Sequence, residues 1–175
     1  MSDARDAIAL LRGLRATRDF TDQPIPQAVI DDIADVSRWT GSASNRQPWH
    51  VVIVRDRETL RRIAAAEGHC AHAGNAAAAV VIVLDNERPE LEAYDDGRLS
   101  ERIMLAAAAH GIGSCIGFLV GGGRDEIRRL LGAPESALAR TVISLGYRDM
   151  AAHASRPKRA QVRKPSAEII HFDRI

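Results

Sequence analysis

The sequence predicts an α+β sandwich in which helices flank one mixed β-sheet. Segments with the 3.6-residue hydrophobic period of helices alternate with short β-branched runs typical of buried strands. The expected helices outnumber the strands and are not spaced as uniform βα units, which disfavours a doubly wound sheet. A length of 175 residues is sufficient for one domain with a single sizeable core.

The first part of the chain contains two expected helices and one expected strand. Residues Ala4–Leu14 are rich in Ala and Leu, and Gln27–Trp39 places apolar side chains along one helical face after two prolines. The β-branched run Trp49–Val54 predicts a buried strand. The charged segment Arg55–Glu58 then begins a third helix.

The second half continues the alternation. The run Ala76–Leu84 predicts a second buried strand, and Asp96–His110 predicts a long helix. The glycine-rich stretch Gly111–Gly123 is expected to interrupt regular structure. A short helix over Asp125–Leu131 and a third strand over Arg140–Tyr147 complete the pattern.

Composition and charge exclude several classes of protein. Hydrophobic residues make up 46% and charged residues 27%, as in ordinary globular domains, and a net charge of +1 provides no field that attracts nucleic acid. The longest apolar stretch is far shorter than the ~20 residues that a membrane span requires. With two cysteines and no secretion signal expected, we predict a cytoplasmic protein without membrane or nucleic-acid partners.

Two clusters suggest chemistry but match no familiar motif. A dinucleotide fingerprint requires a glycine at the third position after Gly113, where Ile116 stands, so a Rossmann site is disfavoured. The glycines form either turns or a surface that a flat ligand can approach closely. His69, Cys70 and His72 lack a second ligand pair, so we predict no metal site. No acid, base or nucleophile arrangement is evident, and we assign no catalytic side chain.

Three separated segments suit parts of one ligand. Arg15 and Arg18 could grip a phosphate, although surface arginines are equally compatible. The loop before the first strand carries hydroxyl and amide groups that suit the edge of a heterocycle: Ser42, Ser44, Asn45 and Gln47. Arg163 and Lys164 near the C-terminus are again either phosphate ligands or solvated charge.

At these residues the sequence resembles the flavin-dependent nitroreductase family. The resemblance rests on RATRDF, SASNRQPWHVVIV, GIGSCIGF, SLGY and RKPSAEIIHF, in this order, and Ser42–Trp49 is the most specific part. It implies a nitroreductase-like sandwich with a mainly antiparallel sheet. It also implies a homodimer that holds one FMN in each of two interface sites. Residues 1–155 would form the flavin-binding core, and residues 156–175 a domain-swapped tail on the partner.

The resemblance assigns roles residue by residue. Arg15, Arg18 and Arg163 look like basic residues that hold FMN, with Arg18 near the pyrimidine edge. The loop residues that meet the isoalloxazine and ribityl groups look like Ser42, Asn45 and Gln47. Gly117 and Phe118 resemble the backbone segment beside the hydride-accepting nitrogen. Leu14, Ala16 and Gln161 differ from the residues that are common at these positions in the family. Fewer side chains would therefore be available to bind the FMN phosphate.

The implied activity is an FMN-dependent NAD(P)H oxidoreductase. NADH or NADPH would reduce the flavin and leave, and a nitroaromatic, quinone or related small acceptor would then enter the same pocket, giving ping-pong kinetics. Two alternatives stay open: a flavin-binding sensor or carrier without turnover, and a flavin-free interaction module whose basic tail binds an acidic partner.

Overall fold

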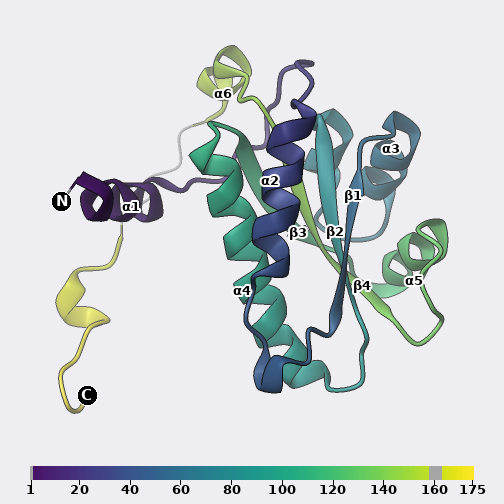
Figure 1. Ribbon diagram of the computed structural model, residues 1–175. Coiled ribbons are helices and arrows are strands. Elements are labelled where there is room, and N and C mark those ends of the chain that lie inside the picture. Colours follow the sequence, from purple (N-terminus) through teal and green to yellow (C-terminus); the bar gives the residue numbers. More distant parts are fainter. Residues whose placement is uncertain (1, 158–162) are drawn as a thin grey trace.

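A computed structural model describes residues 2–157 and 163–175, which form a four-stranded sheet with helices on both faces (Figure 1). The strands are β1 (Trp49–Val54), β2 (Ala78–Leu84), β3 (Gly113–Phe118) and β4 (Leu138–Gly146). The helices are α1 (Ser2–Gly13), α2 (Gln27–Arg38), α3 (Arg57–Ala65), α4 (Pro89–Ala109), α5 (Gly121–Leu130) and α6 (Met150–Ser155). Three short 3-10 turns are η1 (Ala43–Asn45), η2 (Ala71–Asn75) and η3 (Ser166–Glu168).

The sheet has the order β1-β2-β4-β3, and every pairing between these strands is antiparallel. The α+β class is therefore confirmed. A parallel pairing occurs as an isolated bridge between Ala16 and Ser114, at the edge of β3. All seven residues of β2 are buried, as expected for a central strand covered on both faces.

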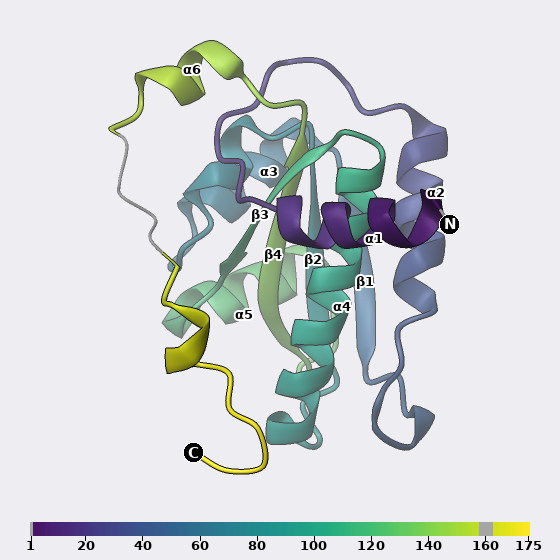
Figure 2. The ribbon, with the colours of Figure 1, turned by 90° about the vertical axis from the view of Figure 1, so that its left-hand side faces the viewer.

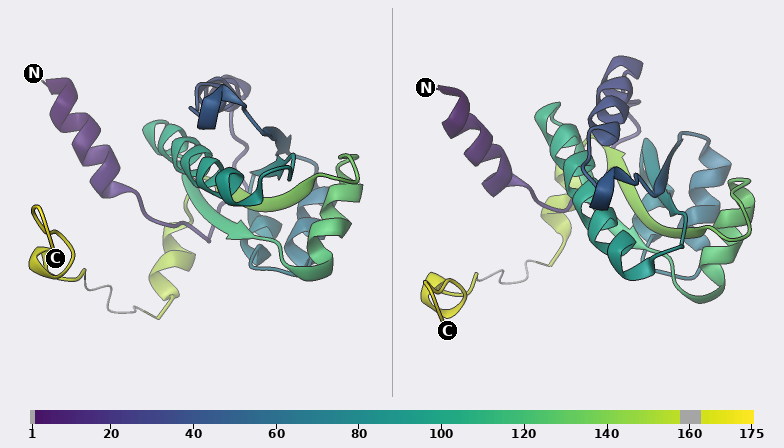
Figure 3. Two further views of the ribbon diagram at one scale, coloured as in Figure 1. Left: turned by 90° about the horizontal axis from the view of Figure 1, so that it is seen from below. Right: turned by 60° about the horizontal axis from the view of Figure 1, so that its bottom comes forward.

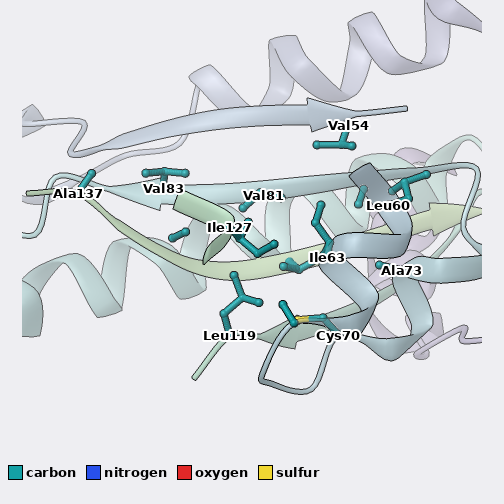
Figure 4. Close-up of a cluster of buried hydrophobic side chains, with 14 residues drawn as sticks. Val54, Leu60, Ile63, Cys70, Ala73, Val81, Val83, Leu119, Ile127 and Ala137 are labelled. Atoms are coloured by element: carbon teal, nitrogen blue, oxygen red, sulfur yellow. The ribbon is translucent and has the colours of Figure 1, made fainter. Parts of the chain in front are cut away.

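Alternate residues of the strands supply two separate cores. Val81 and Val83 pack with α3, α5 and η2 on one face, where Leu60, Ile63 and Ile127 are fully buried (Figure 4). Ile82 packs with α2 and α4 on the other face. Helices α2 and α4 lie side by side there, as Figure 2 also shows.

Two sequence predictions need correction. The glycine-rich stretch was expected to be irregular, but residues 113–118 form β3, because pairing with β4 supplies the hydrogen bonds that a glycine-rich segment does not favour alone. The long helix begins at Pro89 rather than at Asp96. The first turns of this helix are polar, so the hydrophobic pattern does not mark where the helix begins. Near this start, buried Glu92 accepts hydrogen bonds from the backbone amides of Asn86 and Arg88 at 2.7 and 2.8 Å.

The two ends of the described chain project from the same side of the body. Helix α1 and residues 163–175 stand away from the sheet on the side of α4 (Figure 3). Every residue in 163–175 is exposed, including Ile169, Ile170 and Phe172. Within residues 2–157 and 163–175, no helix combines the length and the apolar character that crossing a bilayer demands.

Truncation of the central strand tests the packing. Ile82→Ala removes a fully buried side chain and should reduce the free energy of unfolding by about 2–5 kcal/mol, as measured by urea denaturation. Val36→Ala, at a side chain that is 36% exposed, serves as the control and should cost less than half as much. Equal losses in the two variants would contradict the assignment of the core.

Candidate functional site

The loop between α2 and β1 has an unusual backbone. Ser44, Asn45 and Gln47 have φ values of 53°, 54° and 52°, in the left-handed region that non-glycine residues rarely occupy. Such a conformation costs about 1–3 kcal/mol per residue and persists only where surrounding contacts impose it. Ser42 Oγ accepts the amide of Gln47 at 2.8 Å, and Asp95 Oδ2 accepts the amide of Ala43 at 3.3 Å.

This conformation presents amide groups on the surface. The side chains of Asn45 and Gln47 are exposed, and Gln47 Nε2 lies 3.3 Å from the carbonyl of Asn45. Ser42, by contrast, is engaged as an acceptor within the loop. Backbone strain concentrated in a loop with exposed amide side chains is characteristic of a binding segment.

The segment after α1 is anchored to the start of β3. The amide of Thr17 donates to the carbonyl of Ser114 at 2.7 Å, and buried Thr17 Oγ1 accepts from Nε and Nη2 of Arg148 at 3.2 and 3.0 Å. A Cβ at Gly113 would lie 2.8 Å from the Thr17 side chain, so this close approach requires glycine. Arg18, the next residue, is exposed.

The segment before η2 lies close to the end of β3. A Cβ at Gly117 would lie 2.3 Å from the carbonyl oxygen of His69 and 2.8 Å from Nε2 of His72. His69 donates its amide to the carbonyl of Phe118 at 2.8 Å, and the two rings lie 4.8 Å apart. Phe118 is 48% exposed, so this pair forms an aromatic surface beside Gly117.

The surroundings of His72, Cys70 and Cys115, beside β3, favour the neutral forms of these side chains. Burial and the nearby charge of Arg18 lower the pKa of His72, whose Nδ1 lies 2.6 Å from Ser144 Oγ. Burial raises the pKa of the Cys70 thiol to about 11 and also raises the pKa of Cys115. Both thiols are therefore protonated at neutral pH and unsuited to nucleophilic attack.

The structure brings some of the expected site residues together and separates others. Arg18 lies close enough to His72 to lower its pKa, and His72 Nε2 would lie 2.8 Å from a Cβ at Gly117. The Ser42–Gln47 loop contacts α4 at Asp95, whereas Arg15 lines a cavity with Ala108. Thirteen residues of helix separate these two positions of α4, which is about 20 Å at 1.5 Å per residue.

The remaining expectations concern the C-terminal segment and metals. Arg163 is exposed, with no hydrogen bond or ion pair to other described residues, and Gln161 lies outside the described residues. No three His, Cys, Asp or Glu side chains of residues 2–157 and 163–175 are grouped as a metal would need. His69, Cys70 and His72 instead serve to pack η2 against the sheet.

Sequence reasoning missed two residues at this site. Arg148 follows the last strand and carries no motif, so its bond to Thr17, 131 residues away, had no local signal. His72 was considered only as a metal ligand. Its spacing from Ser144 along the chain likewise gave no hint of their contact.

Comparison with known proteins identifies the family. Residues 11–94 match the Nitroreductase family. The chain is 35% identical over 153 residues to a putative NADH dehydrogenase/NAD(P)H nitroreductase of Archaeoglobus fulgidus, covering 81% of this chain and 85% of the relative. It is 28% identical to an NADPH-flavin oxidoreductase of Vibrio harveyi, covering 77% and 62%. The chain therefore belongs to the nitroreductase family.

Solved structures show the same fold. An FMN-dependent nitroreductase from Clostridium difficile superposes with a TM-score of 0.81 at 23% identity, covering 96% of this chain and 99% of that one. A putative NADH oxidase from Clostridium acetobutylicum gives 0.79 at 19% identity, covering 95% and 99%. The expectation of a nitroreductase fold is confirmed.

The close approach at Gly117 can be tested by adding one methyl group. Gly117→Ala should destabilise the protein by about 1–3 kcal/mol, because its Cβ would collide with the backbone of His69. Gly122→Ala is the matched control, since its Cβ would meet Glu67 at an ordinary 3.7 Å. Equal thermal stability of the two variants would contradict this prediction, because it would show that the backbone around His69 can shift at little energetic cost.

The lowered pKa of His72 predicts a pH dependence of stability. Below its ordinary pKa of 6.5 the unfolded state binds the proton more readily than the folded state, so stability should fall as pH decreases through this window. His72→Gln should show a flatter dependence in urea denaturation between about pH 4.5 and about pH 7.5. Parallel curves for the two proteins would assign the dependence to other groups.

Proposed function

We propose that this chain is an FMN-dependent NAD(P)H oxidoreductase that reduces nitroaromatic, quinone or related small acceptors as a homodimer. The observation that carries the proposal is the separation of two complementary half-sites along α4. One half-site holds Arg15 beside Ala108 near the end of α4, and the other holds the strained amide loop beside Asp95. A second copy of the chain can bring its loop to the first chain's arginines, which a single chain cannot do.

The available groups fit FMN. Arg15, Arg18 and Arg163 form no ion pair with the described carboxylates, so their charge remains available to a phosphate or to the flavin's electron-rich pyrimidine edge. The exposed amides of Asn45 and Gln47 can both donate and accept, as the edge of the ring requires. The names of the Vibrio and Clostridium relatives support a flavin and a nicotinamide donor.

Each residue then has a role in binding. Bound FMN would supply hydride transfer itself. Arg18 would place positive charge at the pyrimidine edge, and Gly117 with Phe118 would line the ring near its hydride-accepting position. Ser42 would hold the loop so that Asn45 and Gln47 orient the ring from the partner. Ping-pong kinetics follow because donor and acceptor would share this one surface.

Exposed apolar side chains support the dimer. Leu91 and Tyr94 of α4 are 43% and 78% exposed, and Ile116 and Phe118 of β3 are 45% and 48% exposed. Large exposed apolar groups on adjoining elements mark interaction surfaces. Residues 1–155 would form the core, and the tail of residues 156–175 would place Ile169, Ile170 and Phe172 against the partner. Burial of these side chains would stabilise the dimer.

Absorption spectroscopy tests the cofactor and donor together. The purified protein with added FMN should show a bound-flavin spectrum that bleaches when NADH or NADPH is added anaerobically. Bound flavin that neither donor bleaches would favour the sensor or carrier. Failure to bind FMN would overturn the proposal.

Complementation between two variants tests the shared site. Arg18→Gln and Asn45→Ala should each weaken FMN binding, by about 1.5–3 and about 0.5–1.5 kcal/mol respectively. After subunit exchange, a mixed dimer regains one intact site, formed by Arg18 of one chain and Asn45 of the other. About a quarter of all sites should then bind FMN with wild-type affinity, as measured by fluorescence titration. No recovery on mixing would contradict a site shared between chains.

A further inference from the structure

Two side-chain contacts join the Ser42–Gln47 loop to the beginning of α4. Asp95 Oδ2 accepts the backbone amide of Ala43 at 3.3 Å, and Arg46 Nη2 lies 2.6 Å from Oε2 of Glu87, just before the helix. The first contact joins residues that are 52 positions apart in sequence, and the second joins residues 41 positions apart. The conformation of the loop is therefore tied to α4 as well as to its own neighbours.

These two contacts differ in strength. The side chain of Glu87 is 67% exposed, whereas Asp95 is only 4% exposed. An exposed ion pair contributes about 0–1 kcal/mol, because water screens its charges. A hydrogen bond to a buried carboxylate is stronger, and the carboxylate is costly to leave without its partner. Asp95 therefore holds the loop more firmly than Glu87 does.

Asp95 also supports the start of the loop through Arg98. Arg98 Nη1 lies 3.6 Å from Asp95 Oδ1, and a Cβ at Gly41 would lie 2.8 Å from Arg98 Nη2. The guanidinium thus lies close to both the carboxylate and the residue that precedes the loop. The two oxygens of Asp95 act at two places, directly at Ala43 and through Arg98 beside Gly41.

The backbone of the loop requires such an anchor. Ser44, Asn45 and Gln47 are all left-handed, at a cost of about 1–3 kcal/mol each, so the loop would relax without contacts that impose this shape. The bond from the Gln47 amide to Ser42 Oγ lies within the loop and can move with it. The bond to Asp95 ties the loop to a long helix. A change of φ at Asn45 or Gln47 would redirect their exposed side chains.

Neighbouring carboxylates of α4 hold other segments. Glu92 accepts two amides of the segment before the helix, and Asp96 accepts a hydrogen bond from Thr141 of β4 at 2.7 Å. Asp96 is 4% exposed, exactly as buried as Asp95. The two consecutive aspartates therefore differ in what they hold, and this makes Asp96 a matched control for Asp95.

We propose that Asp95 is a positioning residue, whose buried carboxylate fixes the Ser42–Gln47 loop in the conformation that presents Asn45 and Gln47 to a ligand. Asp95 acts through the loop, because its own carboxylate is buried. The identity of the ligand, FMN bound to the partner subunit, rests on the proposed function. The effect of Asp95 on the loop does not.

Hydrogen exchange measured by NMR on the flavin-free, full-length protein tests the effect on the loop. Asp95→Ala should speed exchange of the Ala43 and Gln47 amides about tenfold or more relative to that of Val81 in β2, which reports global unfolding. Asp96→Ala, the matched control, should leave this ratio unchanged. An unchanged ratio in Asp95→Ala would overturn the proposal.

Fluorescence titration with FMN tests the effect on the ligand. Asp95→Ala should weaken FMN binding about three- to tenfold, and Asp95→Asn should restore most of the affinity because it keeps an oxygen that accepts the Ala43 amide. In a chain that already carries Asn45→Ala and Gln47→Ala, adding Asp95→Ala should weaken binding by less than about twofold, since the groups it positions are gone. Equal losses in the two backgrounds would overturn the positioning role.

The two experiments separate this proposal from the proposed function. If the wild-type protein does not bind FMN, the proposed function fails, and hydrogen exchange still decides whether Asp95 fixes the loop. If FMN binds equally well to the wild-type protein and to Asp95→Ala, the proposed function stands and the positioning role is overturned.

Discussion

The antiparallel pairing of β3 with β4 is the constraint on which the site depends. It fixes a strand whose glycines at positions 113 and 117 allow two other segments to approach the backbone closely, one near each end of the strand. Thr17 occupies the space beside Gly113, and His72 with the backbone of His69 occupies the space beside Gly117. A side chain at either position would displace the segment that carries Arg18 or the one that carries the aromatic pair.

Helix α4 determines how far apart the two half-sites lie. It packs Leu99 and Ile103 into the core, and it contacts the Ser42–Gln47 loop near one end and the arginine-lined cavity near the other. Because a helix is rigid over this length, the loop contact at Asp95 and the Arg15 position beside Ala108 stay about 20 Å apart along its axis within a single chain. Under the proposed function, a second copy of the chain would complete each half-site.

Much of the architecture was predictable from local pattern. The strand Trp49–Val54 was predicted with its observed bounds, and β2 was predicted to within two residues, because long β-branched runs have few alternatives. The strand β3 was missed since glycine, serine and cysteine carry little strand preference. The early start of α4 was missed because its first turns are polar and are stabilised by a buried carboxylate.

The sequence by itself determined the fold class, the family resemblance and the residue types suited to a flavin, because periodicity and short motifs are local properties of the chain. Tertiary structure alone decided which of those residues meet. It placed Arg148 against Thr17 and His72 against Ser144, pairs that are 131 and 72 residues apart. It also set Arg15 in a cationic cavity and moved the amide loop to the far end of α4. Contacts over such distances arise from sheet pairing and helix packing, which no local pattern records.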